Sequence, residues 1–178
     1  MKEITWSKAK EICGRPCRVC WAVARHKNQQ SICPLGWKMQ TSMNPLMFAV
    51  SIAPPRFTHD LILNSAEMVI AWPDEDLAQA TLDCGTQSGR DTDKFEQYSL
   101  TPVPATDVSV PLVKECAVNM ECTVNGRLTS GDHTIFAAEV LRIWVNPDHK
   151  RQLCLVDDSS GFETLLKAGA YRFGAVKK

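Results

Sequence analysis

Residues 31–61, SICPLGWKMQTSMNPLMFAVSIAPPRFTHDL, contain a polar turn, two predicted strands and a predicted helix start. Asn44-Pro45 predicts a turn between the strands, because proline fixes its own φ and keeps the residue before it out of the helical region. Leu46–Ile52 is apolar except for one serine, which predicts a strand buried on both faces. Pro54-Pro55 ends this strand, because proline cannot donate to a β-ladder.

Arg56 and a helix N-terminus follow that strand directly. Thr58 occupies the expected N-cap position, and Asp60 falls in the first turn, where an acidic side chain is favourable. The free N–H groups and the dipole of a helix N-terminus attract anions, and Arg56 adds a positive charge. The segment therefore predicts an anion site, although an ordinary strand-to-helix loop with a solvated arginine would give the same pattern.

The composition indicates one domain that spans residues 1–178. The 20 Lys and Arg residues balance the 20 Asp and Glu residues, without a block of like charge. Neither nucleic acid nor an anionic membrane surface is therefore expected as the main partner. No apolar run is long enough for a transmembrane helix, and the N-terminus lacks the apolar core of a signal peptide. We therefore expect no membrane partner and a cytoplasmic location.

The chain contains eight cysteines, and a reducing compartment predicts that they do not form a disulfide framework. Cys13-x-x-x-Cys17-x-x-Cys20 has the spacing with which three thiolates bind a four-iron cluster in one class of enzymes. A cysteine-ligated metal or iron–sulfur protein is therefore one alternative. Against it, residues 17–24 have the pattern of a strand, which would turn Cys17 and Cys20 to opposite faces.

The remaining pattern favours a mainly β fold with inserted helices. Six or seven strands are expected, over residues 17–24, 31–41, 46–52, 67–72, 118–125, 133–145 and 151–156. Helices are expected over residues 4–12, 58–65 and 91–98 and from Pro73 to a stop at Gly85, with helical turns near 111–117 and 162–166. These elements favour a closed or sandwiched sheet with helical excursions, and the helix at 91–98 is expected to expose Lys94.

Three separated motifs lie between about residues 15 and 145. The first comprises Gly36-Trp37, Ser42-x-x-Pro45, Ser51-Ile52 and Pro55-Arg56-Phe57-Thr58; the second is CGTQSGRDTDKF at 84–95; the third is GDHTIFAAEV at 131–140. In this order and spacing they resemble the flavoredoxin and flavin reductase-like FMN-binding proteins. The resemblance implies an FMN-binding split β-barrel, commonly assembled as a homodimer.

The resemblance also implies which residues contact the cofactor. A phosphate prefers cations and hydroxyl donors, so Arg56, Thr58, Ser88 and Lys94 are expected to hold the FMN phosphate. The other expected flavin contacts are Ser31, Trp37, Lys38, Met39, Gln40, Thr41, Ser42, Ser51, His133 and Tyr171. Of these, Trp37 is the aromatic candidate for the ring face, and Tyr171 is expected to cover the flavin of a partner chain.

Two functions are compatible with these residues. The first is an NADH- or NADPH-dependent oxidoreductase that passes electrons from bound FMN to free flavin or another acceptor. The alternative is a flavoredoxin-type electron carrier between redox proteins. His133 is expected beside the flavin or the nicotinamide, but hydride transfer needs no protein base. Cys33 is either a redox-active thiol near the flavin or a buried, inert one.

Overall fold

The structure is a computed structural model that describes residues 3–6, 9, 13–14, 16–156, 161–169 and 171–177. The helix expected over residues 4–12 lies largely outside the described residues. The fold is mainly β with inserted helices, as predicted. It contains more and shorter strands than expected, because several predicted strands are interrupted; the strand expected over 17–24 forms β1 (Cys17–Arg18) and β2 (Cys20–His26).

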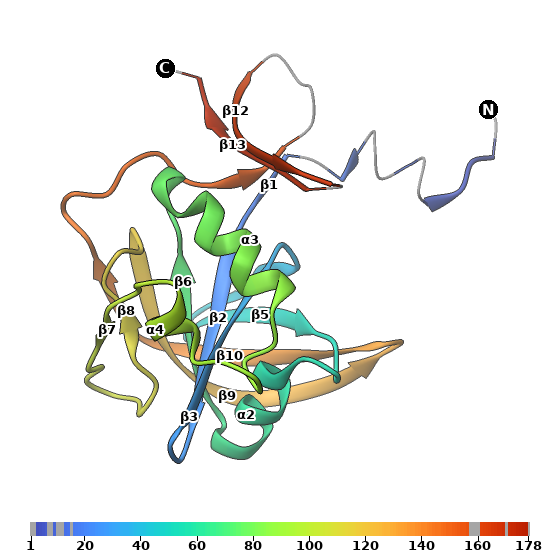
Figure 1. The fold of residues 1–178 in the computed structure, drawn as a ribbon. Coiled ribbons are helices and arrows are strands. Elements are labelled where there is room, and N and C mark those ends of the chain that lie inside the picture. The colour runs from blue at the N-terminus through green and yellow to red at the C-terminus, as the bar shows by residue number, and fades with distance from the viewer. Residues whose placement is uncertain are drawn as a thin grey trace.

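A seven-stranded antiparallel sheet forms the body of the molecule (Figure 1). Its strands lie in the order β3 (Gln29–Leu35), β2, β6 (Glu67–Trp72), β9 (Val118–Ser130), β10 (His133–Val145), β5 (Leu46–Ile52) and β4 (Lys38–Met43). The bounds of β5, β6 and β10 agree with the prediction, whereas β9 is longer than expected. The sheet is not closed, because its order begins at β3 and ends at β4.

Two residues, Gly36 and Trp37, connect the edge strands β3 and β4. A residue spans at most about 3.5 Å, so the sheet must curl until its two edges nearly meet. The prediction of one strand over 31–41 was therefore wrong: the chain leaves one edge of the sheet at Leu35 and enters the other at Lys38. Gly36 fits this crossing because a Cβ atom there would lie 2.9 Å from Cys17 Sγ.

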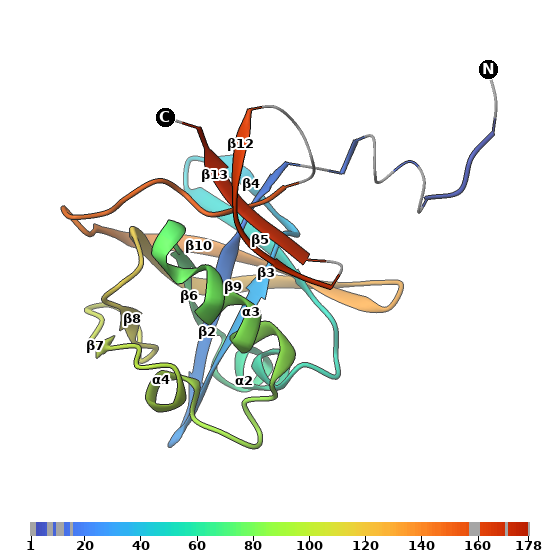
Figure 2. The same cartoon turned by 45° about the horizontal axis from the view of Figure 1, so that its top comes forward.

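A second, four-stranded sheet lies over α3 (Ala78–Thr86), as Figures 1 and 2 show. It has the order β1, β11 (Cys154–Leu155), β13 (Tyr171–Val176) and β12 (Phe162–Ala168). The helical turn expected at 162–166 was wrong, because these residues pair with β13. The helical turn expected at 111–117 was also wrong, because β8 (Leu112–Val113) pairs there with β7 (Pro102–Val103).

The helices begin at other residues than predicted. Arg56, not Thr58, is the N-cap of α2 (Phe57–Ser65), and it makes no side-chain capping bond. Asp74 caps a 3-10 turn over Glu75–Leu77 that leads into α3, so Pro73 precedes the helical segment and Gly85 lies inside α3. Asp93 caps α4 (Lys94–Gln97). Among the described residues, no helix has the length and apolar character required to cross a membrane.

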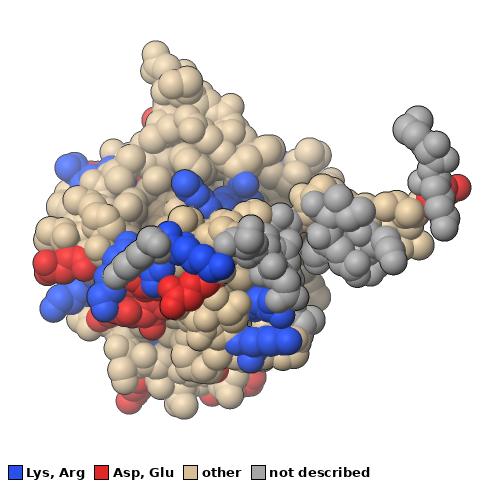
Figure 3. Space-filling model, turned by 90° about the horizontal axis from the view of Figure 1, so that it is seen from above, with Lys and Arg blue, Asp and Glu red and all other residues tan. Residues whose placement is uncertain are grey.

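Successive side chains of β2 point to opposite faces of the sheet and so contribute to two separate apolar cores. Trp21 and Val23 face the core shared with α3, whereas Cys20, Ala22 and Ala24 face the core shared with α2. Trp21 Nε1 donates to Thr81 Oγ1 at 3.1 Å and so ties β2 to α3. On the face seen in Figure 3, acidic and basic side chains intermingle, in keeping with the balanced charge of the sequence.

Candidate functional site

Four predicted phosphate ligands line one cavity of about 140 Å³: Arg56, Thr58, Ser88 and Lys94. They arrive from three places, which are the start of α2, the loop after α3 and the start of α4. Ser31, from β3, lines the same cavity. We call this cavity the cradle.

The N-terminus of α2 opens into the cradle. The first N–H groups of a helix have no partner within the helix, and no side chain caps those of α2. Thr58 is buried at the second position of the helix, and Arg56 is its N-cap. The Arg56 guanidinium donates to the carbonyl O of Gly85 at 3.2 Å, which holds it beside α3. Backbone donors and a cation therefore converge on the cradle, as the sequence predicts for an anion site.

Ser31 presents a polar atom without a partner. Its side chain is 1% exposed, and its Oγ makes no hydrogen bond to any described residue. A buried hydroxyl is normally paired, because an unpaired one carries the full cost of desolvation. A ligand oxygen in the cradle would satisfy this hydroxyl, so the residues present fit a phosphate group.

Lys94 is buried, and the expectation that α4 exposes it was wrong. Its side chain is 4% exposed, and Nζ donates to the carbonyl O of Ile32 at 2.6 Å and of Cys84 at 2.5 Å. Burial lowers the pKa of this amine, and nearby Arg56 acts in the same direction. An ammonium group has three donors, so one remains for a ligand in the cradle.

A second cavity of about 170 Å³ adjoins the cradle, and Cys33, Arg56 and Thr86 line both. We call this second cavity the chamber. Its apolar lining comes from distant segments of the chain and includes Val19, Pro34, Leu35, Leu82, Leu155 and Phe173. The cradle and chamber together have a cationic, hydrogen-bonding end and an apolar end. That shape suits a ligand with one phosphate and a flat ring.

Tyr171 lines the chamber of its own chain. Its ring stacks on Phe173 with centroids 6.5 Å apart and planes at 13°. Tyr171 therefore belongs to the chamber of its own chain, and its expected role over a partner's flavin stays a prediction. Burial raises the pKa of the Cys33 thiol, which disfavours the thiolate and favours the inert interpretation of this cysteine.

Trp37 and His133 form a separate pair. Their ring centroids are 4.7 Å apart, and His133 Nδ1 lies 2.7 Å from Asp132 Oδ1. A third cavity of about 190 Å³ is lined by Trp37, Lys38, Met39 and Ser51, and it shares no lining residue with the cradle or the chamber. Gln40, Thr41 and Ser42 continue along β4 and line none of these three cavities. The structure thus divides the predicted site residues into two groups.

Several residues that line the chamber were not predicted from the sequence. Thr86 belongs to the motif CGTQSGRDTDKF, two residues before Ser88, so the sequence carried a signal for it. Leu155 and Val19 carry no local signal, since only the pairing of distant segments brings them to the chamber. Among the described residues, no group of three His, Cys, Asp or Glu side chains is arranged to hold a metal ion.

Comparison with known proteins identifies the family. Residues 14–166 match the family described as flavin reductase like domain. The chain belongs to this family. An uncharacterised protein of Archaeoglobus fulgidus is 39% identical over 107 residues, which is 60% of the present chain and 60% of that relative. The chain thus spans less than two thirds of that relative's length.

Solved structures share the fold of this flavin reductase-like chain. Flavoredoxin of Desulfovibrio vulgaris (Miyazaki F) has a TM-score of 0.80 at 19% identity, covering 100% of this chain and 94% of its own. An FMN-binding protein of Thermus thermophilus has a TM-score of 0.75 at 24% identity, covering 92% and 89%. The predicted split-barrel fold is confirmed, with a curled sheet that stays open between β3 and β4.

Proposed function

We propose that this protein binds FMN and acts as an NADH- or NADPH-dependent oxidoreductase. The observation that carries the proposal is the cradle, where the unpartnered Ser31 hydroxyl, buried Lys94 and the α2 N-terminus surround one cavity. When bound, FMN would supply two-electron chemistry between a nicotinamide and an acceptor. The chain's own residues would bind the cofactor and orient it.

The cradle residues fit a terminal phosphate. Lys94 supplies a fixed cation, because its amine is already held by the Ile32 and Cys84 carbonyls and cannot swing away. Arg56 adds a second cation at the boundary with the chamber. Charge-assisted bonds from such fixed donors are roughly twice as strong as neutral ones. These groups favour FMN over riboflavin, which lacks the phosphate.

The chamber fits the flavin ring. Its apolar side chains exclude water from the ring faces, and Tyr171 and Phe173 offer a flat aromatic surface. The ring would lie along Cys33–Gly36, where backbone groups near the crossing between β3 and β4 are available for its polar edge. His133 remains the candidate for contact with a nicotinamide or acceptor. Trp37, expected at the flavin ring face, instead lies beside His133 and is 57% exposed, so we assign it to the same contact.

Cofactor identity and donor use test this proposal. Mass spectrometry of cofactor released from the purified protein should find FMN, and FAD as the dominant species would contradict it. Rapid mixing of the FMN-loaded protein with NADH or NADPH under argon should bleach the flavin absorbance within seconds. Binding of FMN without bleaching by either nucleotide would favour the flavoredoxin-type electron carrier instead.

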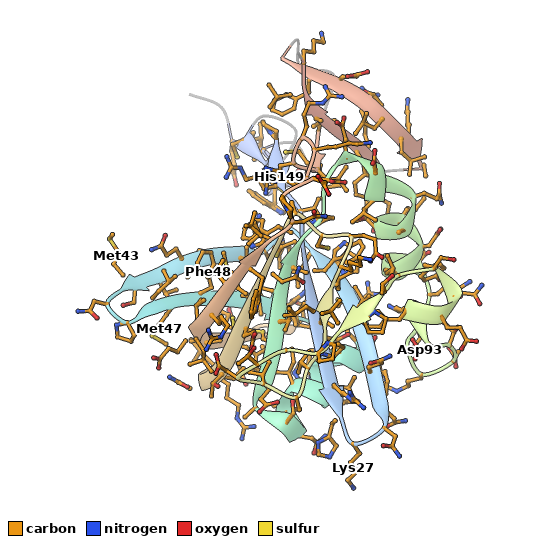
Figure 4. The ribbon with its side chains drawn as sticks, turned by 90° about the vertical axis from the view of Figure 1, so that its left-hand side faces the viewer. Lys27, Met43, Met47, Phe48, Asp93 and His149 are labelled. Carbon is orange, nitrogen blue, oxygen red and sulfur yellow. The ribbon has the colours of Figure 1, made fainter. Side chains whose placement is uncertain are left out.

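We also propose that the protein forms a homodimer through the outer face of β4, β5, β10 and β9. Residues opposite one another in antiparallel strands share a face, which places Met39, Ala49, Ala137 and Gly126 in one row. Ile135 and Leu128 form the next row. Apart from Ser51, which lies opposite Ile135, these two rows are apolar, with Met39 59% and Leu128 64% exposed. The β4–β5 hairpin projects beyond the face, with Met43 near its end (Figure 4).

Sedimentation at several concentrations tests this assembly. The wild type should sediment as a dimer at micromolar concentration, and added FMN should tighten the dimer if the partner helps to cover the ligand. Leu128→Asp should shift the equilibrium to monomer. A wild-type monomer that retains its flavin at micromolar concentration would show that one chain makes the whole site.

A further inference from the structure

The chamber has two walls that belong to different parts of the fold. Thr81, Leu82 and Thr86 line it from α3, whereas Leu155, Tyr171 and Phe173 line it from the four-stranded sheet. Figures 1 and 2 show β12 and β13 lying over α3. The distance between these walls decides whether a flat ring is held firmly, so the contacts that fix this distance matter for binding.

The backbone around Arg151 is hydrogen-bonded to the segment that precedes α3. The N–H of Glu75 donates to the carbonyl O of Arg151 at 2.8 Å, and the N–H of Leu153 donates to the carbonyl O of Pro73 at 3.3 Å. The N–H of Lys150 donates to Asp74 Oδ2 at 3.1 Å. Arg151 therefore starts from a fixed position on the α3 side of the chamber.

The side chain of Arg151 reaches the β12–β13 hairpin, the same hairpin that carries Tyr171 and Phe173 of the opposite wall. Its Nη1 lies 2.9 Å from Glu163 Oε2 on β12 and 2.9 Å from the carbonyl O of Val176 on β13. Its Nη2 pairs with the carboxylate of Glu75, which leads into α3. The side chains of Arg151 and Glu75 are only 23% and 12% exposed, so solvent and salt screen their ion pair less than a surface pair.

Apolar packing also holds the β12–β13 hairpin to the body, because Phe173 is buried in the core shared with α3 and Leu165 and Leu166 pack against that core. β13 pairs with β11 only at Cys154↔Gly174 and Leu155↔Phe173. Among the described residues, a backbone bond also runs from the N–H of Val156 to the carbonyl O of Arg172, at 2.9 Å. The Arg151 guanidinium adds polar contacts to both strands of the hairpin, which the apolar packing does not supply.

We propose that Arg151 is a positioning residue that holds the β12–β13 hairpin against α3 and so sets the gap in which the flavin ring lies. The inference rests on the proposed function, because it assigns the ring to the chamber. Arg151 does not line the chamber and acts through Tyr171 and Phe173, which do. Arginine suits this role because its planar fork serves several acceptors at once, which lysine cannot do.

Arg151→Met tests the role, with Lys150→Met as the matched control. Lys150 lies in the same segment, but its ammonium pairs with Asp76, 2.6 Å away on the α3 side, and not with the hairpin. Arg151→Met should weaken FMN binding about tenfold and raise the fluorescence of the bound flavin, because Tyr171 no longer packs on the ring. Arg151→Lys should fall between Arg151→Met and the wild type, and Lys150→Met should match the wild type.

Amide hydrogen exchange without ligand supplies a second readout. Arg151→Met should speed exchange in Tyr171–Val176 and leave α2 unchanged, whereas a loss of protection along the whole chain would overturn the positioning role. Unchanged FMN affinity and fluorescence in Arg151→Met, or equal weakening in both variants, would also overturn it while leaving the proposed function intact. A wild type that binds no FMN would overturn the proposed function and the role of Arg151 together.

Discussion

Gly89 lies so close to Ser31 that a Cβ atom at position 89 would be 2.2 Å from Ser31 Oγ and 2.8 Å from Ser31 Cβ. Side chains essentially never approach one another so closely, so residue 89 must be glycine while residue 31 is serine. The contact closes the loop after α3 onto β3. The same contact brings Ser88, the neighbour of Gly89, to the cradle.

Replacing Gly89 by alanine should destabilise the protein and weaken FMN binding. Overpacking of this kind costs about 1–3 kcal/mol, and relief of the clash would move the loop that carries Ser88. Chemical denaturation and FMN titration measure the two effects. Gly161→Ala is the control, because no atom of the described residues lies within 4 Å of a Cβ atom there. If Ser31→Gly does not restore stability to Gly89→Ala, the clash is not the cause.

Lys94→Ala should weaken FMN binding by about 1–3 kcal/mol, the range for loss of a charge-assisted hydrogen bond. Lys94→Ala and Lys94→Met both leave the Ile32 and Cys84 carbonyls without the Lys94 donor, but Lys94→Met keeps the side-chain volume and so avoids a cavity. Fluorescence titration with FMN and with riboflavin separates the effects. Equal losses for both ligands would show that Lys94 does not contact the phosphate.

Stability should fall in acid as Glu121 becomes protonated. Its side chain is fully buried, and burial alone would raise its pKa, but bonds from Trp144 Nε1 and the N–H groups of Asp107 and Thr106 outweigh burial and lower the pKa below the ordinary 4.5. Because the pKa of Glu121 is lower in the folded state than in the unfolded state, its carboxylate stabilises the fold at every pH above the unfolded-state pKa. This contribution is lost as the pH falls through the folded pKa.

Glu121→Gln tests this pH dependence. The variant should be less stable than the wild type at neutral pH, and its stability should depend less steeply on pH below about 4.5, the ordinary value. Glu96→Gln, at an exposed position in α4, is the control and should keep the wild-type profile. Parallel acid profiles for wild type and Glu121→Gln would refute the assignment.

Native thiols should react in an order that follows burial. All eight cysteines are free; Cys13 is exposed, and Cys17 and Cys33 are half-buried. Burial raises the pKa of Cys20, Cys84 and Cys122 to about 12, so these thiols are protonated at neutral pH. A thiol reagent should label Cys13 first and all eight after unfolding without reductant. Fewer than eight in the unfolded protein would reveal a disulfide.

Strands were predicted well where an apolar or alternating run is by itself enough to define the strand. Leu46–Ile52, Glu67–Trp72 and His133–Val145 are apolar or alternating runs bounded by turn residues, and the structure has the same bounds. The prediction of a helical turn at 162–166 failed because these residues form a strand only by pairing with β13, and the local sequence pattern does not reveal that pairing. The break at Gly36-Trp37 was missed for a similar reason, since a curled sheet, not a local signal, requires it.

In the site, too, the residues within local motifs were predicted, whereas contacts between distant segments were not. The motifs around Arg56 and Ser88 led to the cradle, because they resemble those of FMN-binding proteins in residue type and spacing. The burial of Lys94 was not predictable, because its acceptors lie 62 and 10 residues away in sequence. The chamber walls were not predictable either, since β13 comes from the far end of the chain.

The short crossing at Gly36-Trp37 also sets an order for folding. The hairpins β2–β3, β4–β5 and β9–β10 join neighbours in sequence, so each closes only a short loop. The edges β3 and β4 reach their final separation only after β6, β9 and β10 have assembled between them. Chains whose final step depends on such distant pairings fold slowly. Trp37 should therefore be among the last aromatic side chains to reach its native surroundings.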